Sequence, residues 1–155
     1  EDQTTQAPQQ TVESTLTVKG QKYSLKDAAK KTVVFTGMTN KKKTSLSIPS
    51  AVRYKGVIYR VTEIGAKACA GNKKLKTVVI GADIEKIGVK AFYKCVNLKK
   101  VTIQTTKLKA KAVGTKAFAK IHKKAVVKVP KAKKKAYKKW LKKRGIGGKQ
   151  KITGE

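Results

Sequence analysis

Hydrophobic residues recur along the middle of the chain at distances that repeat every 23 residues. The phrase Ile-Gly-x-Lys-Ala at Ile64–Ala68 returns at Ile87–Ala91. Each copy is followed at the same distance by a Leu-x-x-Val-x-Ile phrase, at Leu75–Ile80 and Leu98–Ile103. A looser copy begins 26 residues later, at Val113. A fixed period of this length is typical of stacked repeat units, so the pattern predicts a solenoid.

Each repeat has a strand phrase and a turn phrase. The alternating apolar positions of Leu-x-x-Val-x-Ile predict one short β-strand per repeat, stacked with its neighbours into a parallel sheet. Gly65, Gly88 and Gly114 mark a position where the backbone either turns sharply or closely approaches a neighbour. Because small and large side chains then alternate at fixed positions, successive repeats are expected to interdigitate, with irregular or helical turns opposite the strands.

The chain before the repeats alternates in short β-rich runs. Residues 16–25 predict a hairpin around Gly20, and Thr32–Thr36 predicts a third strand. We therefore expect an N-terminal β cap over residues 16–44. Residues 45–129 are expected to hold the repeats, three clear copies from 61, 84 and 110 plus a partial first copy. Residues 1–15 are polar and predict a disordered linker.

The chain after the repeats changes pattern at Pro130, a residue that can start a helix. Its apolar residues follow helical spacing and are Ala132, Ala136, Tyr137, Trp140 and Leu141. Gly145 is the expected helix stop. Residues 130–155 are therefore predicted to form a C-terminal capping helix and a tail, with a short strand near Lys149–Thr153.

Charge is the second outstanding property, with 39 Lys and Arg against 8 Asp and Glu and a net charge of +31. Such a charge favours anionic partners such as nucleic acid, cell-wall polyanions or charged glycans. Only Arg53, Arg60 and Arg144 are arginines, which argues against specific nucleic-acid recognition. The densest cationic patch is predicted on the C-terminal helix, at Lys134, Lys135, Lys138, Lys139 and Lys142.

Residues for catalysis or metal binding are scarce. The single histidine, His122, is flanked by lysines and predicts a solvated surface residue, and no Gly-x-Ser-x-Gly phrase occurs. Asp83 and Glu85 are interpreted as surface charges paired with local lysines. Cys69 and Cys95 fall on core positions of the repeat, and the sequence leaves open whether they form a disulfide. We expect no enzyme, no cofactor and no small-molecule substrate.

The phrase Ile-Gly-x-Lys-Ala-Phe-x-x-Cys-x-x-Leu-x-x-Val-x-Ile at residues 87–103 resembles the BspA-like (Treponema-type) leucine-rich repeats. The resemblance covers about 85 residues, and it departs at Cys69, at Asn72 and at the stretched third repeat. It implies a bacterial secreted or cell-surface module whose signal peptide has been removed. It also implies adhesion or binding to a host matrix protein, a glycan or a cell-wall polyanion. No segment reaches the roughly 20 apolar residues of a membrane span.

The residues that the repeat leaves free are the candidate binding residues. With alternate strand residues inward, the outward positions on the predicted sheet are Ser47, Thr77, Val79, Lys100, Thr102, Gln104 and Lys128. Threonine and valine at such positions also suit a strand without any ligand. The preferred hypothesis is a non-catalytic binding module that uses the sheet, aided by cationic attraction. The alternative is a non-specific binder of nucleic acid or another polyanion.

Overall fold

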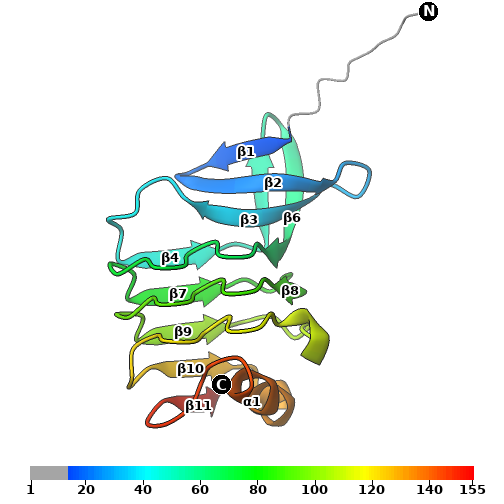
Figure 1. Ribbon diagram of the computed structural model, residues 1–155. Coiled ribbons are helices and arrows are strands. Elements are labelled where there is room, and N and C mark those ends of the chain that lie inside the picture. The colour runs from blue at the N-terminus through cyan, green and yellow to red at the C-terminus, as the bar shows by residue number, and fades with distance from the viewer. Residues whose placement is uncertain (1–13) are drawn as a thin grey trace, which may run out of the picture.

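The computed structural model describes residues 14–155, and they form two β-sheets and one α-helix (Figure 1). The predicted linker therefore lies, for residues 1–13, outside the described residues. The first sheet has the order β1-β2-β3-β6-β5, with β8 also paired to β6. Its strands are β1 (Thr15–Val18), β2 (Gln21–Asp27), β3 (Thr32–Met38), β5 (Ala51–Tyr54), β6 (Val57–Ile64) and β8 (Lys86–Ile87).

The N-terminal sheet follows the predicted turn chemistry. Lys19 and Gly20 both have positive φ, which is the two-residue turn that joins antiparallel strands β1 and β2. Lys55 and Gly56 repeat this geometry between β5 and β6. The predicted hairpin at residues 16–25 is therefore confirmed, and β3 extends the sheet by pairing in parallel with β6.

The second sheet is parallel throughout and has the order β11-β10-β9-β7-β4. Its strands are β4 (Ser45–Ile48), β7 (Thr77–Ile80), β9 (Lys100–Ile103), β10 (Val126–Val129) and β11 (Lys151–Gly154). The prediction of one parallel strand per repeat is confirmed, and so is the short strand predicted near the end of the sequence. The equivalent residues pair in register, as Thr77 with Lys100 and Lys100 with Val126 show.

The stretches that lead from one strand to the next pass in front of the parallel sheet in Figure 1. We call the outer surface of residues 65–72, 88–95 and 114–121 the turn face. Backbone hydrogen bonds tie these stretches together, because Lys67 N–H donates to Val89 O at 2.9 Å and Lys90 N–H donates to Thr115 O at 3.0 Å. The added length of the third repeat contains a short 3₁₀ turn, η2 (Ala110–Ala112).

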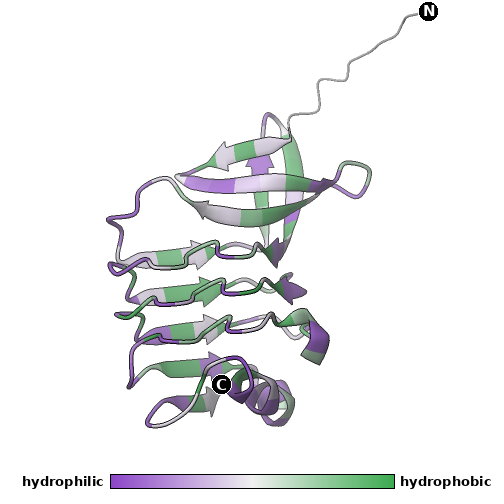
Figure 2. Cartoon of the chain, viewed as in Figure 1, coloured by the Kyte–Doolittle hydropathy of each residue, from purple (hydrophilic) through white to green (hydrophobic). Residues whose placement is uncertain are grey.

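The hydrophobic core lies between the parallel sheet and the turn stretches. Each strand of the repeats sends its alternate residues inward, and Figure 2 shows hydrophobic residues on all of them. Val78, Val101 and Val127 are at most 1% exposed, and they belong to the same core cluster as Phe92 and Phe118. Cys69 and Cys95 are buried in this cluster and are free thiols, so the disulfide that the sequence left open is not formed.

Glycine at the head of each repeat serves a close approach of two backbones. A Cβ on Gly88 would lie 2.4 Å from the nitrogen of Ala66, and one on Gly114 would lie 2.4 Å from the nitrogen of Val89. Neither glycine has positive φ. Of the two roles that the sequence allowed, the structure therefore selects close approach.

The C-terminal helix α1 (Lys134–Lys142) packs against the end of the repeats. Tyr137 and Leu141 are buried, and the Tyr137 hydroxyl donates to Thr105 O at 2.9 Å. The helix begins later than Pro130, because Pro130 is extended and a 3₁₀ turn, η3 (Lys131–Lys133), precedes α1. The Lys131 N–H is held by Glu155 O at 2.9 Å, beside strand β11.

Candidate functional site

The outward side of the parallel sheet, which we call the sheet face, carries two straight rows of side chains. Neighbouring residues in a row lie on hydrogen-bonded strands, which are about 4.8 Å apart. The first row contains Ser45, Thr77, Lys100, Val126 and Lys151. The second row contains Ser47, Val79, Thr102, Lys128 and Thr153. Six of the seven sequence-predicted sheet residues thus lie in two rows, and exposed Gln104 directly follows β9.

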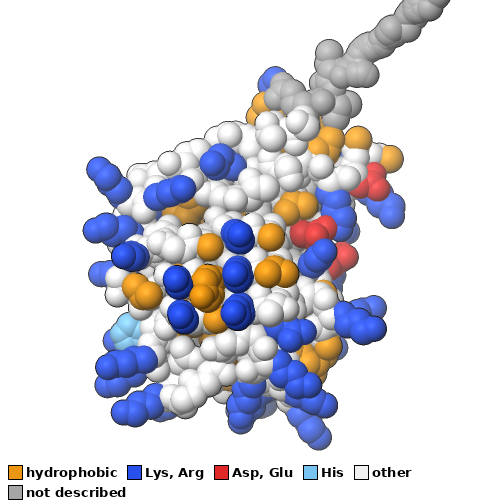
Figure 3. Space-filling view, in the orientation of Figure 1, with side chains coloured by type: hydrophobic (Ala, Val, Ile, Leu, Met, Phe, Trp, Pro, Cys, Tyr) orange, Lys and Arg blue, Asp and Glu red, His pale blue; other side chains and the backbone are white. Residues whose placement is uncertain are grey.

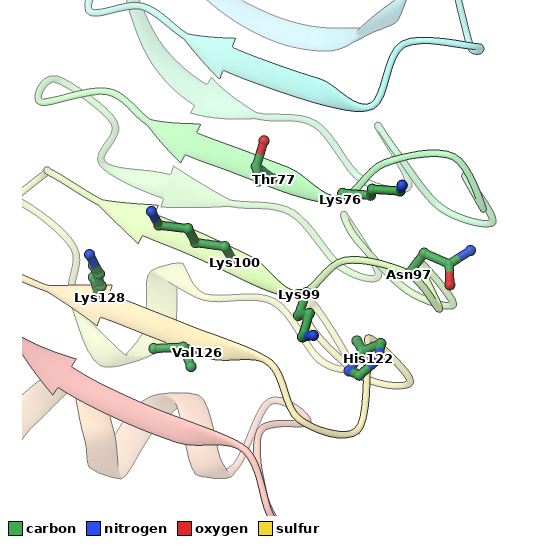
Figure 4. A pocket seen from close by; sticks show the side chains of 8 residues that line it. All are labelled: Lys76, Thr77, Asn97, Lys99, Lys100, His122, Val126 and Lys128. Atoms are coloured by element: carbon green, nitrogen blue, oxygen red, sulfur yellow. The ribbon is translucent and has the colours of Figure 1, made fainter.

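An open depression of about 700 Å³ lies at one end of this face. Its lining comes from three repeats and consists of Lys76, Thr77, Asn97, Lys99, Lys100, His122, Val126 and Lys128. Figure 4 shows Lys100 and Lys128 on the strands, and Asn97 and His122 on the turns that precede them. The depression therefore combines part of the predicted set with residues that the sequence did not mark.

The lining is cationic, with four lysines and no acidic residue. Lys128 Nζ lies 3.7 Å from a carboxylate oxygen of Glu155. Within residues 14–155, Lys76, Lys99 and Lys100 form no ion pair. The unpaired positive charges of these three lysines and the hydroxyl of Thr77 suit a partner that presents oxygen acceptors.

His122 lies in the wall of the depression and takes part in two hydrogen bonds there. Its Nδ1 accepts a hydrogen bond from Lys124 N–H at 3.0 Å, and its carbonyl accepts one from Gln150 Nε2 at 2.9 Å. Asn72 uses its side-chain oxygen in the same way, accepting from Lys74 N–H at 3.0 Å. His122 is partly buried and lines the open depression. The hydrogen bond to the ring depends on the turn geometry, which the flanking lysines in the sequence do not indicate.

The lysines of α1 form a separate cationic patch. All five predicted residues, Lys134, Lys135, Lys138, Lys139 and Lys142, are exposed. None of them lines the depression. Trp140 is half-buried and packs on Tyr137 with ring centroids 5.4 Å apart. It therefore contributes to the contact between the helix and the core.

Two of the acids in residues 14–155 that the sequence analysis considered lie beside basic side chains, and both thiols are buried. Lys107 Nζ lies 2.7 Å from Asp83 Oδ1, and Arg60 lies 3.8 Å from Glu85. Burial raises the pKa of Cys69 to about 12 and that of Cys95 to about 11. Among residues 14–155 no three His, Cys, Asp or Glu side chains gather as a metal site would require. In the same range no helix has the length and apolarity needed to cross a membrane.

The chain matches the BspA type Leucine rich repeat region (6 copies) over residues 58–143. This match extends over more than half of the chain, and the protein belongs to the BspA-type leucine-rich repeat family. The resemblance seen in the sequence is therefore confirmed. No curated protein matches the chain.

Solved structures of bacterial leucine-rich repeat proteins share the fold. A leucine rich cell surface protein from Faecalibacterium prausnitzii is 26% identical with a TM-score of 0.57, covering 84% of this chain and 35% of that one. A leucine-rich repeat protein from Bacteroides capillosus is also 26% identical with a TM-score of 0.60, covering 76% and 83%. A third, from Bacteroides ovatus, is 21% identical with a TM-score of 0.57, covering 76% and 38%, and shows the fold alone.

The chain thus spans about a third of the Faecalibacterium protein. Its fold is leucine-rich-repeat-like, and membership of this repeat family suggests a protein-binding module.

Proposed function

We propose that the chain is a non-catalytic binding module that recognises a host or cell-wall macromolecule through its sheet face. The observation that carries this proposal is the register of the parallel strands, which places Thr77, Lys100 and Val126 side by side and opens the depression beside them. Five strands in register offer an extended surface, and such a surface suits a macromolecule better than a small substrate.

Cationic attraction supports this function. Because Lys76, Lys99 and Lys100 have no acidic partner among the described residues, their charge is available to a ligand. Positive charge of this kind raises the rate of association with anionic partners more than it raises specificity. Hydrogen bonding by Thr77, Thr102 and Gln104 supplies the selectivity in this proposal.

The two ends of the repeats have complementary roles in the proposal. The N-terminal sheet and α1 act as caps that cover the apolar ends of a short solenoid. Buried Phe35 and Tyr137 support this assignment, since each joins the common core from one end. Display on, or secretion from, a bacterial cell fits the surface location in the name of the Faecalibacterium relative.

The test is an array of matrix proteins and glycans at about 150 mM salt, where exposed charges are screened beyond about 8 Å. One matrix protein or glycan other than an anionic polysaccharide should bind, and the Lys100→Gln/Thr102→Ala/Gln104→Ala variant should lose it. The control variant Lys139→Gln/Thr106→Ala removes the same number of positive charges at exposed residues that do not line the depression, and it should retain binding. Equal loss in both variants would refute a role for the sheet face.

Non-specific polyanion binding is the second candidate, and the exposed lysines of α1 favour it. It makes a different prediction, because binding through phosphate contacts falls steeply as salt rises and hardly depends on sequence. If DNA and heparin bind equally and both dissociate at about 150 mM salt, this candidate replaces the first.

A further inference from the structure

The turn face, on the opposite side from the sheet face, carries five lysines in a regular array. Lys67, Lys90 and Lys116 occupy the same position in three successive repeats, and Lys94 and Lys120 occupy a second position four residues later. We call these five residues the lysine ladder. Figure 3 views this side and shows two rows of blue lysine side chains, while the visible acidic side chains lie toward one edge.

Backbone hydrogen bonds hold the ladder in register. Lys67 N–H donates to Val89 O at 2.9 Å and Lys90 N–H donates to Thr115 O at 3.0 Å. Gly71 N–H and Lys94 N–H extend the pattern to Tyr93 O at 2.7 Å and Ala119 O at 3.0 Å. Equivalent residues of neighbouring repeats are therefore about one strand spacing apart, about 4.8 Å. Like charges at this distance repel one another, so the array does not assist folding.

The backbone at these positions also disfavours lysine. All five ladder residues have left-handed conformations, with φ between 56° and 61°. That conformation suits glycine, and asparagine tolerates it better than most residues with a Cβ. The chain itself shows the alternative, because Gly71, with φ 75°, fills the first repeat's copy of the Lys94 position. Lysine is thus present at positions where neither the backbone conformation nor the charge of the neighbouring side chains favours it.

The surroundings keep this charge unneutralised. The segments 65–76, 88–99 and 114–125 contain eleven lysines and no acidic residue. Within the described chain, no ladder lysine takes part in an ion pair. Four of the five are exposed, and Lys90 is half-buried.

An aromatic ring sits among the ladder lysines. The ammonium groups of Lys90, Lys94 and Lys120 lie 5.2 Å, 5.4 Å and 5.9 Å from the centroid of the Tyr93 ring. Tyr93 is half-buried, and its position in the neighbouring repeats holds Ala70 and Ala119. Tyrosine offers a flat apolar surface with a polar hydroxyl at its tip.

We propose that the lysine ladder and Tyr93 form a second binding site, for a linear anionic polysaccharide that runs along the stack of repeats. The lysines contact its charged groups as point charges, and Tyr93 packs against a sugar ring. Nucleic acid fits less well, because the ladder has a single aromatic ring for stacking and no arginine. This inference goes beyond the proposed function and does not depend on the sheet face.

The test compares two variants that each lose five positive charges. The ladder variant is Lys67→Asn/Lys90→Asn/Lys116→Asn/Lys94→Gly/Lys120→Gly, which uses residues that tolerate the left-handed backbone. The control variant replaces Lys134, Lys135, Lys138, Lys139 and Lys142 with Gln. Binding of a heparin oligosaccharide at about 150 mM salt should weaken at least about tenfold in the ladder variant and less than about threefold in the control. Equal weakening would show that only net charge matters and would overturn the site.

Two further measurements keep the proposal testable if the ladder variant unfolds. In the unmodified protein, heparin should protect Lys67, Lys90 and Lys116 from amine acylation more than it protects the α1 lysines, and the reverse pattern would overturn the site. Tyr93→Ala should weaken heparin binding more than Tyr93→Phe, with little change in binding of a single-stranded DNA oligonucleotide. Equal effects on heparin and DNA would overturn the assignment to polysaccharide. The Lys100→Gln/Thr102→Ala/Gln104→Ala variant should bind heparin normally. Failure of the sheet-face proposal can therefore be distinguished from failure of the lysine-ladder proposal.

Discussion

The rings of Phe92 and Phe118 stack on each other, with centroids 5.4 Å apart and planes 11° from parallel. Both rings are fully buried, and each comes from the same position of successive repeats. The contact therefore joins two repeats through their largest side chains. Cys69 occupies the equivalent position in the repeat before and ends the stack.

Phe92→Ala should lower the free energy of unfolding by about 3–5 kcal/mol, because it leaves a cavity between two repeats that cannot collapse. Urea denaturation monitored by circular dichroism measures this change. Val96→Ala, at a side chain that is 43% exposed in the same repeat, is the control and should change stability by less than about 0.5 kcal/mol. A small effect of Phe92→Ala would contradict the packing described here.

Gly88→Ala should destabilise the protein by about 1–3 kcal/mol or more, because the new Cβ would lie 2.4 Å from the backbone nitrogen of Ala66. Backbone atoms of a neighbouring repeat cannot move aside as a flexible side chain can. Gly147→Ala is a matched control, since a Cβ there meets nothing within 4 Å. Thermal unfolding of both variants measures the difference. Similar melting temperatures would mean that the repeats are not so closely spaced.

The buried thiols should make stability depend on alkaline pH. Burial raises the pKa of Cys69 from 9.0 to about 12, and that of Cys95 to about 11. Below pH 9 both states of the chain keep these protons. Between pH 9 and about 11 the unfolded chain loses protons that the folded chain retains, so the contribution to stability falls as pH rises.

This pH effect is isolated by subtracting the urea stability of Cys69→Ala/Cys95→Ala from that of the unmodified protein at each pH. The two proteins differ only at the two thiols, so other effects of pH cancel in the subtraction. The difference should decline from pH 9 upward, and a flat difference would mean that the thiols are accessible. A thiol reagent at neutral pH should modify both cysteines only after denaturant is added.

Tyr137→Phe should cost about 1–3 kcal/mol, because the hydroxyl serves two buried backbone groups. It donates to Thr105 O and accepts from Leu108 N–H at 3.2 Å. Amide hydrogen exchange should accelerate at Leu108 and along α1, with little change in β7. Tyr59→Phe, at a half-buried tyrosine of the N-terminal sheet, should leave these amides unchanged. Uniform acceleration across the chain would show that the helix does not detach on its own.

The strands were predictable because each depends on a pattern within a few residues. The Leu75–Ile80 phrase alternates side chains inward and outward, and the structure forms β7 at Thr77–Ile80 within it. The start of α1 was less predictable. Proline suits the first turn of a helix, but Pro130 lies beside Lys131, whose N–H pairs with the distant Glu155. Tertiary pairing of this kind leaves no local pattern.

The candidate sites depended even more on contacts between repeats. Thr77 and Lys100 were recognisable as outward strand residues, but the depression also needs Asn97 and His122 from the turns. The lysine ladder could not be predicted as a site from the sequence, for a different reason. Lysine at Lys67 and Lys90 resembles ordinary surface charge in the sequence, and only the backbone torsions reveal that these positions favour glycine.

Hydrogen bonds between equivalent turns, such as that from Cys69 N–H to Ala91 O at 2.8 Å, have a consequence for redesign. Each repeat forms backbone hydrogen bonds to the next in the same register, so the solenoid can be lengthened by whole repeats. A duplicated 84–106 unit inserted after residue 106 would add one strand to the parallel sheet. It would also add a copy of Lys90 and a copy of Lys94 to the lysine ladder. Copies of different length would then show whether affinity grows with every added unit or saturates once the ligand is fully spanned.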